Sequence, residues 1–261
     1  MEYKLVATDL DGTLLTTNKK ITKNAINAIL DIRKKGYKVV AVTARNLGSI
    51  KSVCDINIFD YLILNNGVSI VDIDKNEIIS VGNLDKKTYT SITNDVIKDS
   101  IEIDYSSLNY YYVKDDKKTS MNIIRKQINN LEDIKEEVSR MNVFFNDEET
   151  LNEYKKKLQE KYKNLNIFEM QDSSIKYRWL VLNPINVNKA STLKLLSKKL
   201  KIKKEEIIFF GDSLNDLEVM NEVGCSVAME NAVDEVKSKA SKITLSNDND
   251  GVAKFLNNNL K

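Results

Sequence analysis

Short apolar or β-branched runs, each ending at a polar or glycine-containing turn, restrict the fold of this chain more than any other feature. We predict that four of them are buried parallel strands: Leu5–Thr8, Val39–Thr43, Tyr61–Leu64 and Ile207–Phe210. Between the first two, Thr22–Lys35 is predicted to be an amphipathic helix because apolar residues recur at helical spacing and Gly36 follows as a stop. Strand, helix and strand in this order indicate a parallel β-α-β unit.

The same alternation returns in the last third of the chain. Predicted helices at Asn188–Leu200, Asp212–Val223, Ala232–Ala240 and Gly251–Leu260 interleave with predicted strands at Ile207–Phe210, Ser226–Met229 and Lys242–Leu245. Helices that alternate with buried strands favour a doubly wound parallel sheet. We therefore predict one Rossmann-like α/β domain built from residues 1–82 and 185–261.

The middle of the chain, residues 83–184, has a different pattern. Alternating polar and apolar residues predict strands, and Lys/Glu-rich stretches between them predict solvated helices. The predicted strands are Asn109–Val113, Ser120–Ile124, Asn142–Phe145 and Ser174–Leu182, and the predicted helices are Lys86–Lys98, Leu131–Arg140 and Glu148–Tyr162. This segment is predicted to be an inserted α+β domain.

Composition excludes several classes of function. The chain has 40 basic and 38 acidic side chains among 261 residues, and the two signs are interleaved. Such a balance gives no long-range field of one sign, so we expect no nucleic-acid partner. No apolar run approaches the roughly 20 residues that cross a bilayer, so we expect no membrane partner. Because the chain contains no histidine, a histidine base, metal ligand or phosphohistidine is excluded.

The cysteine content points to a reducing compartment. Cys54 and Cys225 are the only two cysteines, and each lies in or beside an apolar stretch. Two isolated cysteines suit buried thiols better than a disulfide framework. With an N-terminus that lacks the pattern of a signal peptide, this predicts a cytoplasmic protein.

Four separate segments carry polar residues where predicted strands end or helices begin. They are D9-L-D-G-T, V42-T-A-R, Lys189 at the start of a helix, and G211-D-S-L-N-D. Carboxyl ends of parallel strands share one edge of a sheet, so the four segments should converge there. Taken alone, Asp9 and Asp11 could form a simple strand-end turn, Thr43 a helix N-cap, and Lys189 one of many exposed lysines.

Together these motifs resemble the haloacid dehalogenase superfamily of phosphotransferases, specifically the Cof-type hydrolases. The likeness covers the full chain and includes N65-N-G, V227-A-M-E-N-A and N247-D-N-D-G-V-A. One departure is Ala190, where the family's K-G-x-A-L motif has glycine. The resemblance implies a Rossmann-like core of parallel strands with a large α/β cap inserted after the third core strand, here residues 83–184.

The resemblance also implies roles for the acidic residues and Lys189. Asp9 would attack phosphorus and ligate Mg²⁺, since a carboxylate nucleophile needs a cation beside an incoming phosphoryl dianion. Asp11 would act as general acid and base and bind the metal through its backbone carbonyl. Asp212 would complete the metal site, with Mn²⁺ as the alternative ion. Lys189 would place its charge against the phosphoryl group and Asp9.

The remaining predicted site residues would bind or orient the substrate. The Thr43 hydroxyl and the Ala44 backbone N–H would donate to phosphate oxygens, and Arg45 would contact the substrate. Asn215 would bind phosphate or metal. Asp212 and Asp216 are four residues apart, which predicts that both lie on one face of a helix's first turn, where Asp216 would orient Lys189 or a metal-bound water.

The expected activity is Mg²⁺-dependent hydrolysis of small phosphorylated metabolites, with sugar phosphates foremost, through an aspartyl-phosphate intermediate. The resemblance supplies this substrate class. Tyr110–Tyr112 and Trp179 are candidate substrate contacts in the inserted domain, although aromatic residues on alternating strands are more often core residues. Two alternatives remain: a phosphomutase of the same fold, and a noncatalytic sensor of a phosphorylated ligand.

Overall fold

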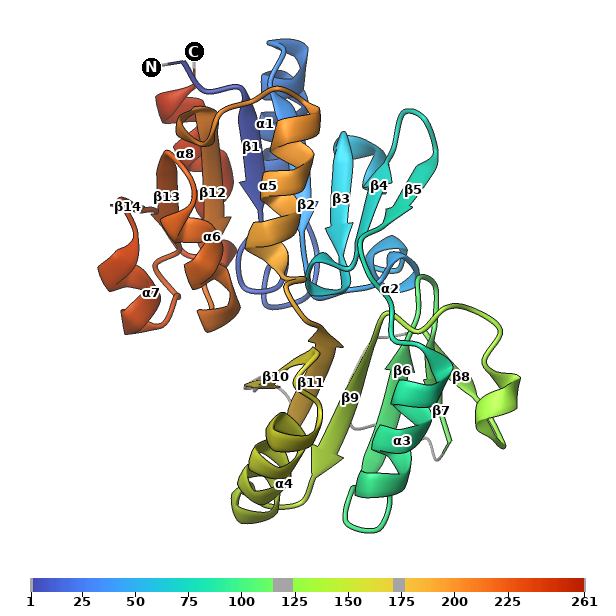
Figure 1. The fold of residues 1–261 in the computed structure, drawn as a ribbon. Helices are drawn as coiled ribbons and strands as arrows, with labels where there is room; N and C mark the ends of the chain where they lie inside the picture. Colours follow the sequence, from blue (N-terminus) through green and yellow to red (C-terminus); the bar gives the residue numbers. More distant parts are fainter. Residues whose placement is uncertain (1, 115–123, 171–176, 261) are drawn as a thin grey trace. The chain divides into compact units, whose positions relative to one another are not determined.

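A computed structural model describes residues 2–114, 124–170 and 177–260 of the chain (Figure 1). It divides into two compact units. The first, the core unit, comprises Met1–Ala44, Val53–Ile79 and Asn188–Lys261. The second, the inserted unit, comprises Arg45–Ser52 and Ser80–Val187. Among the described residues no helix is both long and apolar enough to cross a membrane.

A mainly parallel sheet forms the centre of the core unit. Within the described residues it has eight strands in the order β14-β13-β12-β1-β2-β3-β4-β5. Parallel pairing runs from β14 to β3, and β4 pairs antiparallel with β3. The strands are β1 (Leu5–Thr8), β2 (Lys38–Val42), β3 (Tyr61–Leu64), β4 (Ser69–Asp72), β5 (Glu77–Ser80), β12 (Ile207–Gly211), β13 (Cys225–Ala228) and β14 (Lys242–Ile243). The predicted α/β fold is confirmed.

Helices lie on both faces of this sheet, with α5 and α6 in front of it and α1 and α8 behind it in Figure 1. Their bounds are α1 (Lys23–Lys34), α5 (Lys189–Lys199), α6 (Leu217–Asn221), α7 (Asp234–Lys239) and α8 (Gly251–Asn259). Because both faces are covered, the central strands are buried throughout and apolar at successive positions, as in β1.

Helix α1 shows how the sequence sets these elements. The Thr22 side chain caps its first turn by accepting from the Ala25 backbone N–H. Four residues at helical spacing are buried on one face: Ala25, Ala28, Ile29 and Ile32. Gly36 follows the helix with a φ of +94°, a conformation that glycine adopts without steric cost. Chain direction then reverses into β2.

The inserted unit contains a second sheet, mostly antiparallel. Its described strands lie in the order β10-β11-β9-β6-β7-β8, and only β7 and β8 pair in parallel. They are β6 (Glu102–Ser106), β7 (Tyr111–Val113), β8 (Arg125–Gln127), β9 (Arg140–Phe145), β10 (Leu165–Met170) and β11 (Arg178–Pro184). Helices α3 (Lys86–Val96) and α4 (Glu148–Lys161) share an apolar core with one face of this sheet.

The aromatic residues that were candidate substrate contacts pack as core residues. Tyr112 is buried in the main apolar cluster of the inserted unit, and Tyr110 packs against that cluster. Trp179 stacks on Phe144, with ring centroids 5.4 Å apart, in a smaller cluster. Packing of this kind stabilises a sheet without any ligand.

The predicted helix over Leu131–Arg140 is wrong. Only a short 3-10 turn, η3 (Leu131–Asp133), forms there, and Asn130 and Asp133 cap it reciprocally. Arg140 instead begins strand β9, every residue of which is buried. In the stretch before β9, Val138 forms an isolated bridge with Leu84, and the Glu136 carboxylate accepts from the Ser107 hydroxyl and the Asn109 N–H. These tertiary contacts outweigh the helical preference of its composition. Parts of two other predicted strands, residues 120–123 and 174–176, lie outside the described residues.

One segment of the inserted unit was not predicted to belong there. Arg45–Ser52 contains helix α2 (Leu47–Lys51), capped by Asn46. The Leu47 backbone N–H donates to the Leu108 carbonyl at 2.7 Å. Gly48 packs so closely that a Cβ there would lie 2.0 Å from the Asn109 carbonyl oxygen. These backbone contacts join α2 to the unit that contains the predicted insertion, residues 83–184.

A buried polar cluster lies on the inserted sheet, on the strand positions that alternate with its apolar face. Asp104 is 1% exposed and accepts from the Asn142 side chain at 2.7 Å, while Glu102 pairs with Arg125 beside it. Burial raises the pKa of the Asp104 carboxyl to about 7, although Arg140 and the bond from Asn142 act in the opposite direction. The carboxyl is therefore protonated more readily in the folded protein than in the unfolded one.

We predict that Asp104→Asn flattens the pH dependence of stability. A raised folded pKa means that the contribution of Asp104 is fully present at pH values below about 4 and is lost as pH rises to about 7, by up to about 4 kcal/mol. Urea unfolding of both proteins between pH 4 and pH 8 measures the difference between their curves. Parallel curves would contradict the assigned pKa.

Candidate active site

The residues predicted to carry chemistry lie mainly at one edge of the core sheet. Asp9 follows β1, and its backbone N–H donates to the Phe210 carbonyl of β12 at 2.9 Å. Asp212 follows β12 directly, so the two carboxylates extend from neighbouring strand ends. Asp9 is 5% exposed, which a simple strand-end turn would not require. The sheet thus brings together residues about 200 positions apart in sequence.

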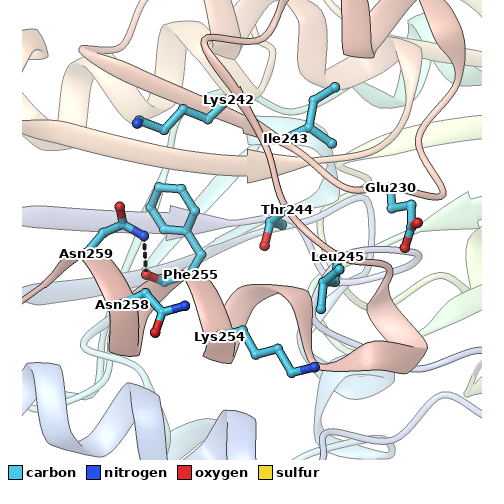
Figure 2. Close-up of a pocket in the computed structure, with 9 residues that line it drawn as sticks. All are labelled: Glu230, Lys242, Ile243, Thr244, Leu245, Lys254, Phe255, Asn258 and Asn259. Atoms are coloured by element: carbon cyan, nitrogen blue, oxygen red, sulfur yellow. Dashed lines mark hydrogen bonds between the residues drawn. The ribbon is translucent and has the colours of Figure 1, made fainter.

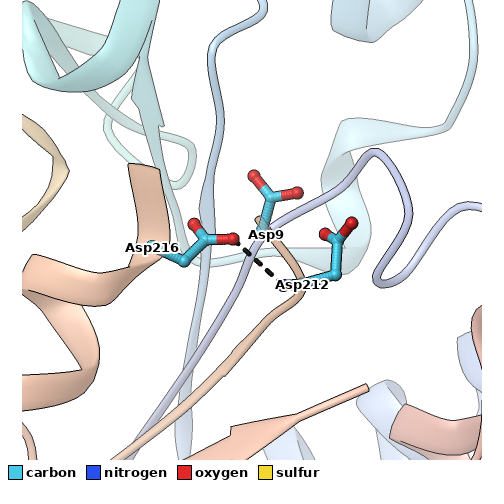
Figure 3. Close-up of side chains that lie close together, drawn as sticks. All are labelled: Asp9, Asp212 and Asp216. Carbon is cyan, nitrogen blue, oxygen red and sulfur yellow. Dashed lines mark hydrogen bonds between the residues drawn. The ribbon is translucent and has the colours of Figure 1, made fainter. Parts of the chain in front are cut away.

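Three carboxylates form a compact cluster. Asp9, Asp212 and Asp216 each offer an oxygen, and these oxygens lie within 4.8 Å of one another (Figure 3). Asp216 Oδ2 holds the turn between Asp212 and Asp216, because it accepts from the backbone N–H groups of Asp212 and Ser213 at 3.1 and 3.2 Å. Oxygen ligands from separate segments at this spacing could hold a hard divalent cation.

The predicted helix over Asp212–Val223 is wrong in its first turns. Asp212 lies in a loop, a 3-10 turn η5 (Leu214–Asp216) follows, and α6 starts only at Leu217. The two backbone bonds to the Asp216 carboxylate hold this loop and replace the first helical turn. Asp212 and Asp216 are still brought together, but by a side-chain-capped loop rather than by one helical face.

Lys189 is the cation of this cluster. It is the first residue of α5, whose N-cap is Asn188, and it is only 3% exposed. Its Nζ donates to Asp9 Oδ1 at 2.6 Å and to Asp216 Oδ1 at 2.7 Å. The alternative that Lys189 is a solvent-exposed lysine is therefore wrong.

The electrostatics of the cluster follow from burial and from unequal numbers of charges. Burial raises the pKa of Asp9 well above its ordinary value, and the neighbouring Asp216 and Asp212 add to this against the lowering effect of Lys189. Burial, then Asp216, raises the pKa of Asp212 to about 7. Burial lowers the pKa of Lys189, but Asp216 and Asp9 outweigh it and leave that pKa raised. Lys189 therefore stays charged.

The donor set fits a divalent cation. The cluster contains three carboxyl groups and one ammonium, so their full ionisation would leave two uncompensated negative charges in a buried space. A bound divalent ion would neutralise these charges and would oppose the rise in the pKa values of Asp9 and Asp212. The loop after Asp9 is also pressed onto Asp212: Gly12 has a φ of +81°, and a Cβ there would lie 2.3 Å from Asp212 Oδ2. Thr13 donates to Asp212 Oδ1 at 2.8 Å and orients it.

Asp11 is partly exposed, whereas Thr43, one of the predicted phosphate ligands, is buried. Asp11 is half-buried and accepts from Lys19 Nζ at 2.9 Å. Thr43 follows β2 and is 1% exposed, and its backbone N–H donates to the Ile63 carbonyl at 2.9 Å. The N-cap of α2 is Asn46, so the alternative that Thr43 caps that helix is wrong. Ala44 is the last residue of its core-unit segment.

Arg45 and Asn215 complete the predicted set. Arg45 belongs to the inserted unit, and its Nη1 donates to Ser49 Oγ at 2.9 Å. Asn215 lies on η5, and its amide donates to Asn66 Oδ1 at 3.4 Å. Asn66, whose backbone N–H also donates to the Thr43 carbonyl at 3.0 Å, thus connects two predicted phosphate ligands. No role was predicted for it, although the N65-N-G motif marked the turn.

Two hollows on the described part of the core unit lie away from this cluster. One, of about 680 Å³, is lined by residues of β14 and α8 and by the segments beside them (Figure 2). Another, of about 380 Å³, is bordered by α1 and β2. Neither is lined by a predicted site residue. The carboxylate cluster is therefore identified by its chemistry rather than by cavity size.

Comparison with known proteins establishes the family. The model of the haloacid dehalogenase-like hydrolases matches residues 6–256, so this chain belongs to that family. The predicted resemblance is confirmed.

Individual relatives narrow the class of activity. Two 5-amino-6-(5-phospho-D-ribitylamino)uracil phosphatases of Bacillus subtilis are 30% and 29% identical to this chain over 258 and 282 residues. These alignments cover 98% of this chain in both cases, and 95% and 98% of the respective relatives. A haloacid dehalogenase-like hydrolase of Bacteroides thetaiotaomicron has a crystal structure that superposes with a TM-score of 0.87 at 26% identity, covering 98% of this chain and 99% of that one. The protein is a phosphatase of this family.

We predict that Lys189→Met destabilises the protein by about 3–5 kcal/mol, because it leaves buried carboxylates without their cation. Mg²⁺ should restore part of the loss by binding those carboxylates. Thermal unfolding with Mg²⁺ or EDTA tests both effects. Lys194→Met, which changes an exposed lysine on the same helix, is the matched control. Equal midpoints for the two variants would contradict the assigned role of Lys189.

Proposed function

We propose that this protein is a Mg²⁺-dependent phosphatase that hydrolyses a small phosphomonoester metabolite through a phosphoryl group transferred to Asp9. The observation that carries the proposal is the Asp9 carboxylate itself, buried at a strand end, bound by the Lys189 ammonium and adjacent to two further carboxylates. A structural ion pair would need one carboxylate for one ammonium. A phosphatase needs the additional negative charge to hold a divalent cation.

Asp9 and Asp212, with the backbone carbonyl of Asp11, are the proposed ligands of Mg²⁺. When bound, the ion would offset the repulsion between the phosphoryl dianion and the nucleophile. Lys189 contributes a fixed positive charge that also offsets this repulsion. Asp216 orients the Lys189 ammonium through the 2.7 Å hydrogen bond. Thr13 holds the orientation of Asp212.

Two displacements at phosphorus make up the proposed reaction. In the first, an Asp9 oxygen forms a bond to phosphorus, the bond from phosphorus to the substrate oxygen breaks, and Asp11 gives its proton to that leaving oxygen. In the second, Asp11 takes a proton from water, the water oxygen bonds to phosphorus, and the bond to Asp9 breaks. Inorganic phosphate leaves, and Asp9 and Asp11 return to their initial forms.

Binding of the phosphoryl oxygens is proposed for three groups outside the carboxylate cluster. The Thr43 hydroxyl, the Ala44 N–H and the Asn215 amide are the proposed donors, and Asn66 positions Thr43 and Asn215 through its two hydrogen bonds. Arg45 remains a predicted substrate contact.

The proposed substrate class rests on the relatives. Two of them are named for a phosphorylated ribityl aminouracil, so that compound and sugar phosphates are the first to test. A cytoplasmic location is part of the proposal, because the two cysteines suit a reducing compartment.

We predict that Asp9→Asn abolishes phosphate release while leaving the fold intact, because it removes the nucleophile and keeps the side-chain shape. Phosphate release should be measured with sugar phosphates, nucleotides, pyridoxal phosphate, p-nitrophenyl phosphate and the ribityl aminouracil phosphate, with Mg²⁺ or EDTA. Asp31→Asn, which changes an exposed residue of α1, is the control that keeps wild-type turnover.

The outcomes of that assay separate the candidate functions. Release that requires both Mg²⁺ and Asp9 supports the proposed phosphatase and ranks its substrates. Transfer of phosphate to a second sugar hydroxyl would favour a mutase. Binding without release across all compounds would favour a sensor, and wild-type turnover by Asp9→Asn would refute the mechanism.

A further inference from the structure

We propose that Lys19 is a positioning residue for Asp11, and that the C-terminal segment Asn247–Asp250 holds the loop that carries Lys19. This inference rests on the proposed function, because it concerns the residue that transfers the proton. It assigns a role to the N247-D-N-D-G motif, which the proposed chemistry does not use.

The chain after Asp9 folds back on itself in a loop, residues 10–20, which we call the return loop. The Leu15 N–H donates to the Leu10 carbonyl at 2.8 Å, and Asp11 and Leu15 form an isolated bridge. The Thr16 N–H then donates to the Lys20 carbonyl at 2.9 Å, and the Lys19 N–H to the Thr16 carbonyl at 2.8 Å. This second turn brings the Lys19 side chain back to Asp11, where Nζ donates to Oδ1 at 2.9 Å.

The backbone at Lys19 does not favour lysine. Its φ is +56°, in the left-handed region where glycine and asparagine are preferred. The preceding residue is Asn18, yet the left-handed position is occupied by Lys19 and not by this asparagine. A residue held in such a conformation is a starting point for a functional hypothesis about its side chain. The Lys19 side chain donates to Asp11.

The C-terminal segment Asn247–Asp250 fixes the return loop from outside. Asp248 accepts from the Thr17 N–H at 2.8 Å and from the Thr17 hydroxyl at 2.7 Å. The Asn247 amide donates to the Leu15 carbonyl at 2.9 Å. Asp250 accepts from Thr22 and Asn24, just after the loop. These contacts join the loop to residues more than 220 positions away, so its conformation does not depend on local turns alone.

Positioning is the effect that this geometry supports. The Asp11 and Lys19 side chains are 33% and 29% exposed, so solvent screens their attraction and the pair adds little stability. The pair has a larger effect through the orientation of Asp11, because displacing a catalytic group by about 1 Å can lower the reaction rate up to about 100-fold. The ammonium contacts Oδ1, and it can do so whether the acidic proton is on Oδ2 or absent. The contact is thus compatible with both roles of Asp11.

The test compares Lys19→Asn, Lys19→Arg and Lys20→Asn. Asparagine suits the left-handed backbone and removes the ammonium, arginine retains a cation, and Lys20 is the exposed neighbour that serves as the charge control. We expect Lys19→Asn to lower kcat/KM about tenfold for ribose 5-phosphate, whose alkoxide leaving group needs a proton, and less than about twofold for p-nitrophenyl phosphate, whose leaving group does not. Lys19→Arg should regain most of the loss, and Lys20→Asn should match wild type.

A double-mutant cycle separates this inference from the proposed function. In an Asp11→Asn background, Lys19→Asn should cause no further loss, because the group that it positions is already gone. Equal losses on both substrates, or a further loss in that background, would overturn the role of Lys19 and leave the proposed function standing. If Asp11→Asn itself turns over ribose 5-phosphate at the wild-type rate, the acid/base role of Asp11 fails instead.

Thr17→Val tests the contribution of the C-terminal segment. It removes the hydroxyl donor to Asp248 but keeps the backbone donor, so we expect a smaller loss with the same preference for ribose 5-phosphate over p-nitrophenyl phosphate. Asp248→Ala removes the acceptor of both bonds, and wild-type kcat/KM of that variant on both substrates would show that Asp248 does not act through this loop.

Discussion

The bond between the buried Lys189 ammonium and the carboxylates of Asp9 and Asp216 is the interaction on which the rest of the site depends. Three carboxylates gathered at one sheet edge repel each other strongly, because burial removes the water that would screen them. Lys189 offsets part of that repulsion and holds one oxygen of Asp9. What it does not offset is the charge that a divalent cation requires. The same arrangement therefore gives the site its structure and leaves it with negative charge that a divalent cation would neutralise.

Such a cluster can exist only on a scaffold that fixes all of its members. Asp9 is held by the backbone of β12, Asp212 by Thr13 and the close approach of Gly12, and Asp216 by two N–H groups of its own loop. Lys189 starts a capped helix, so its Cα position is fixed by α5. The central strands beneath are fully buried and apolar, which makes this end of the sheet rigid. Preorganised charges of this kind need no rearrangement when charge develops on a reacting group.

Much of this could be predicted from sequence, for a physical reason. A strand buried on both faces carries mainly apolar or β-branched residues, and Leu5–Thr8 and Tyr61–Leu64 have in the structure the bounds that this pattern predicts. The convergence of Asp9, Lys189 and Asp212 then follows from parallel topology. Three features did not follow. The Lys/Glu-rich stretch before Arg140 has helical composition, but tertiary contacts of Glu136 and Val138 overrule it. Arg45 joins the inserted unit through backbone contacts of its neighbours, and Lys19 contacts Asp11 from a left-handed turn. Tertiary contacts and turn conformations of this kind leave no periodic signal.

The central claim is that phosphate passes through Asp9, and chemical trapping tests it directly. The protein would be mixed with a substrate in the presence of Mg²⁺, quenched with borohydride, which reduces an aspartyl phosphate to homoserine, and digested for peptide mass spectrometry. The account predicts homoserine at position 9, dependent on substrate and absent from Asp9→Asn. Phosphate release without homoserine at position 9, or with homoserine at another aspartate, would contradict it.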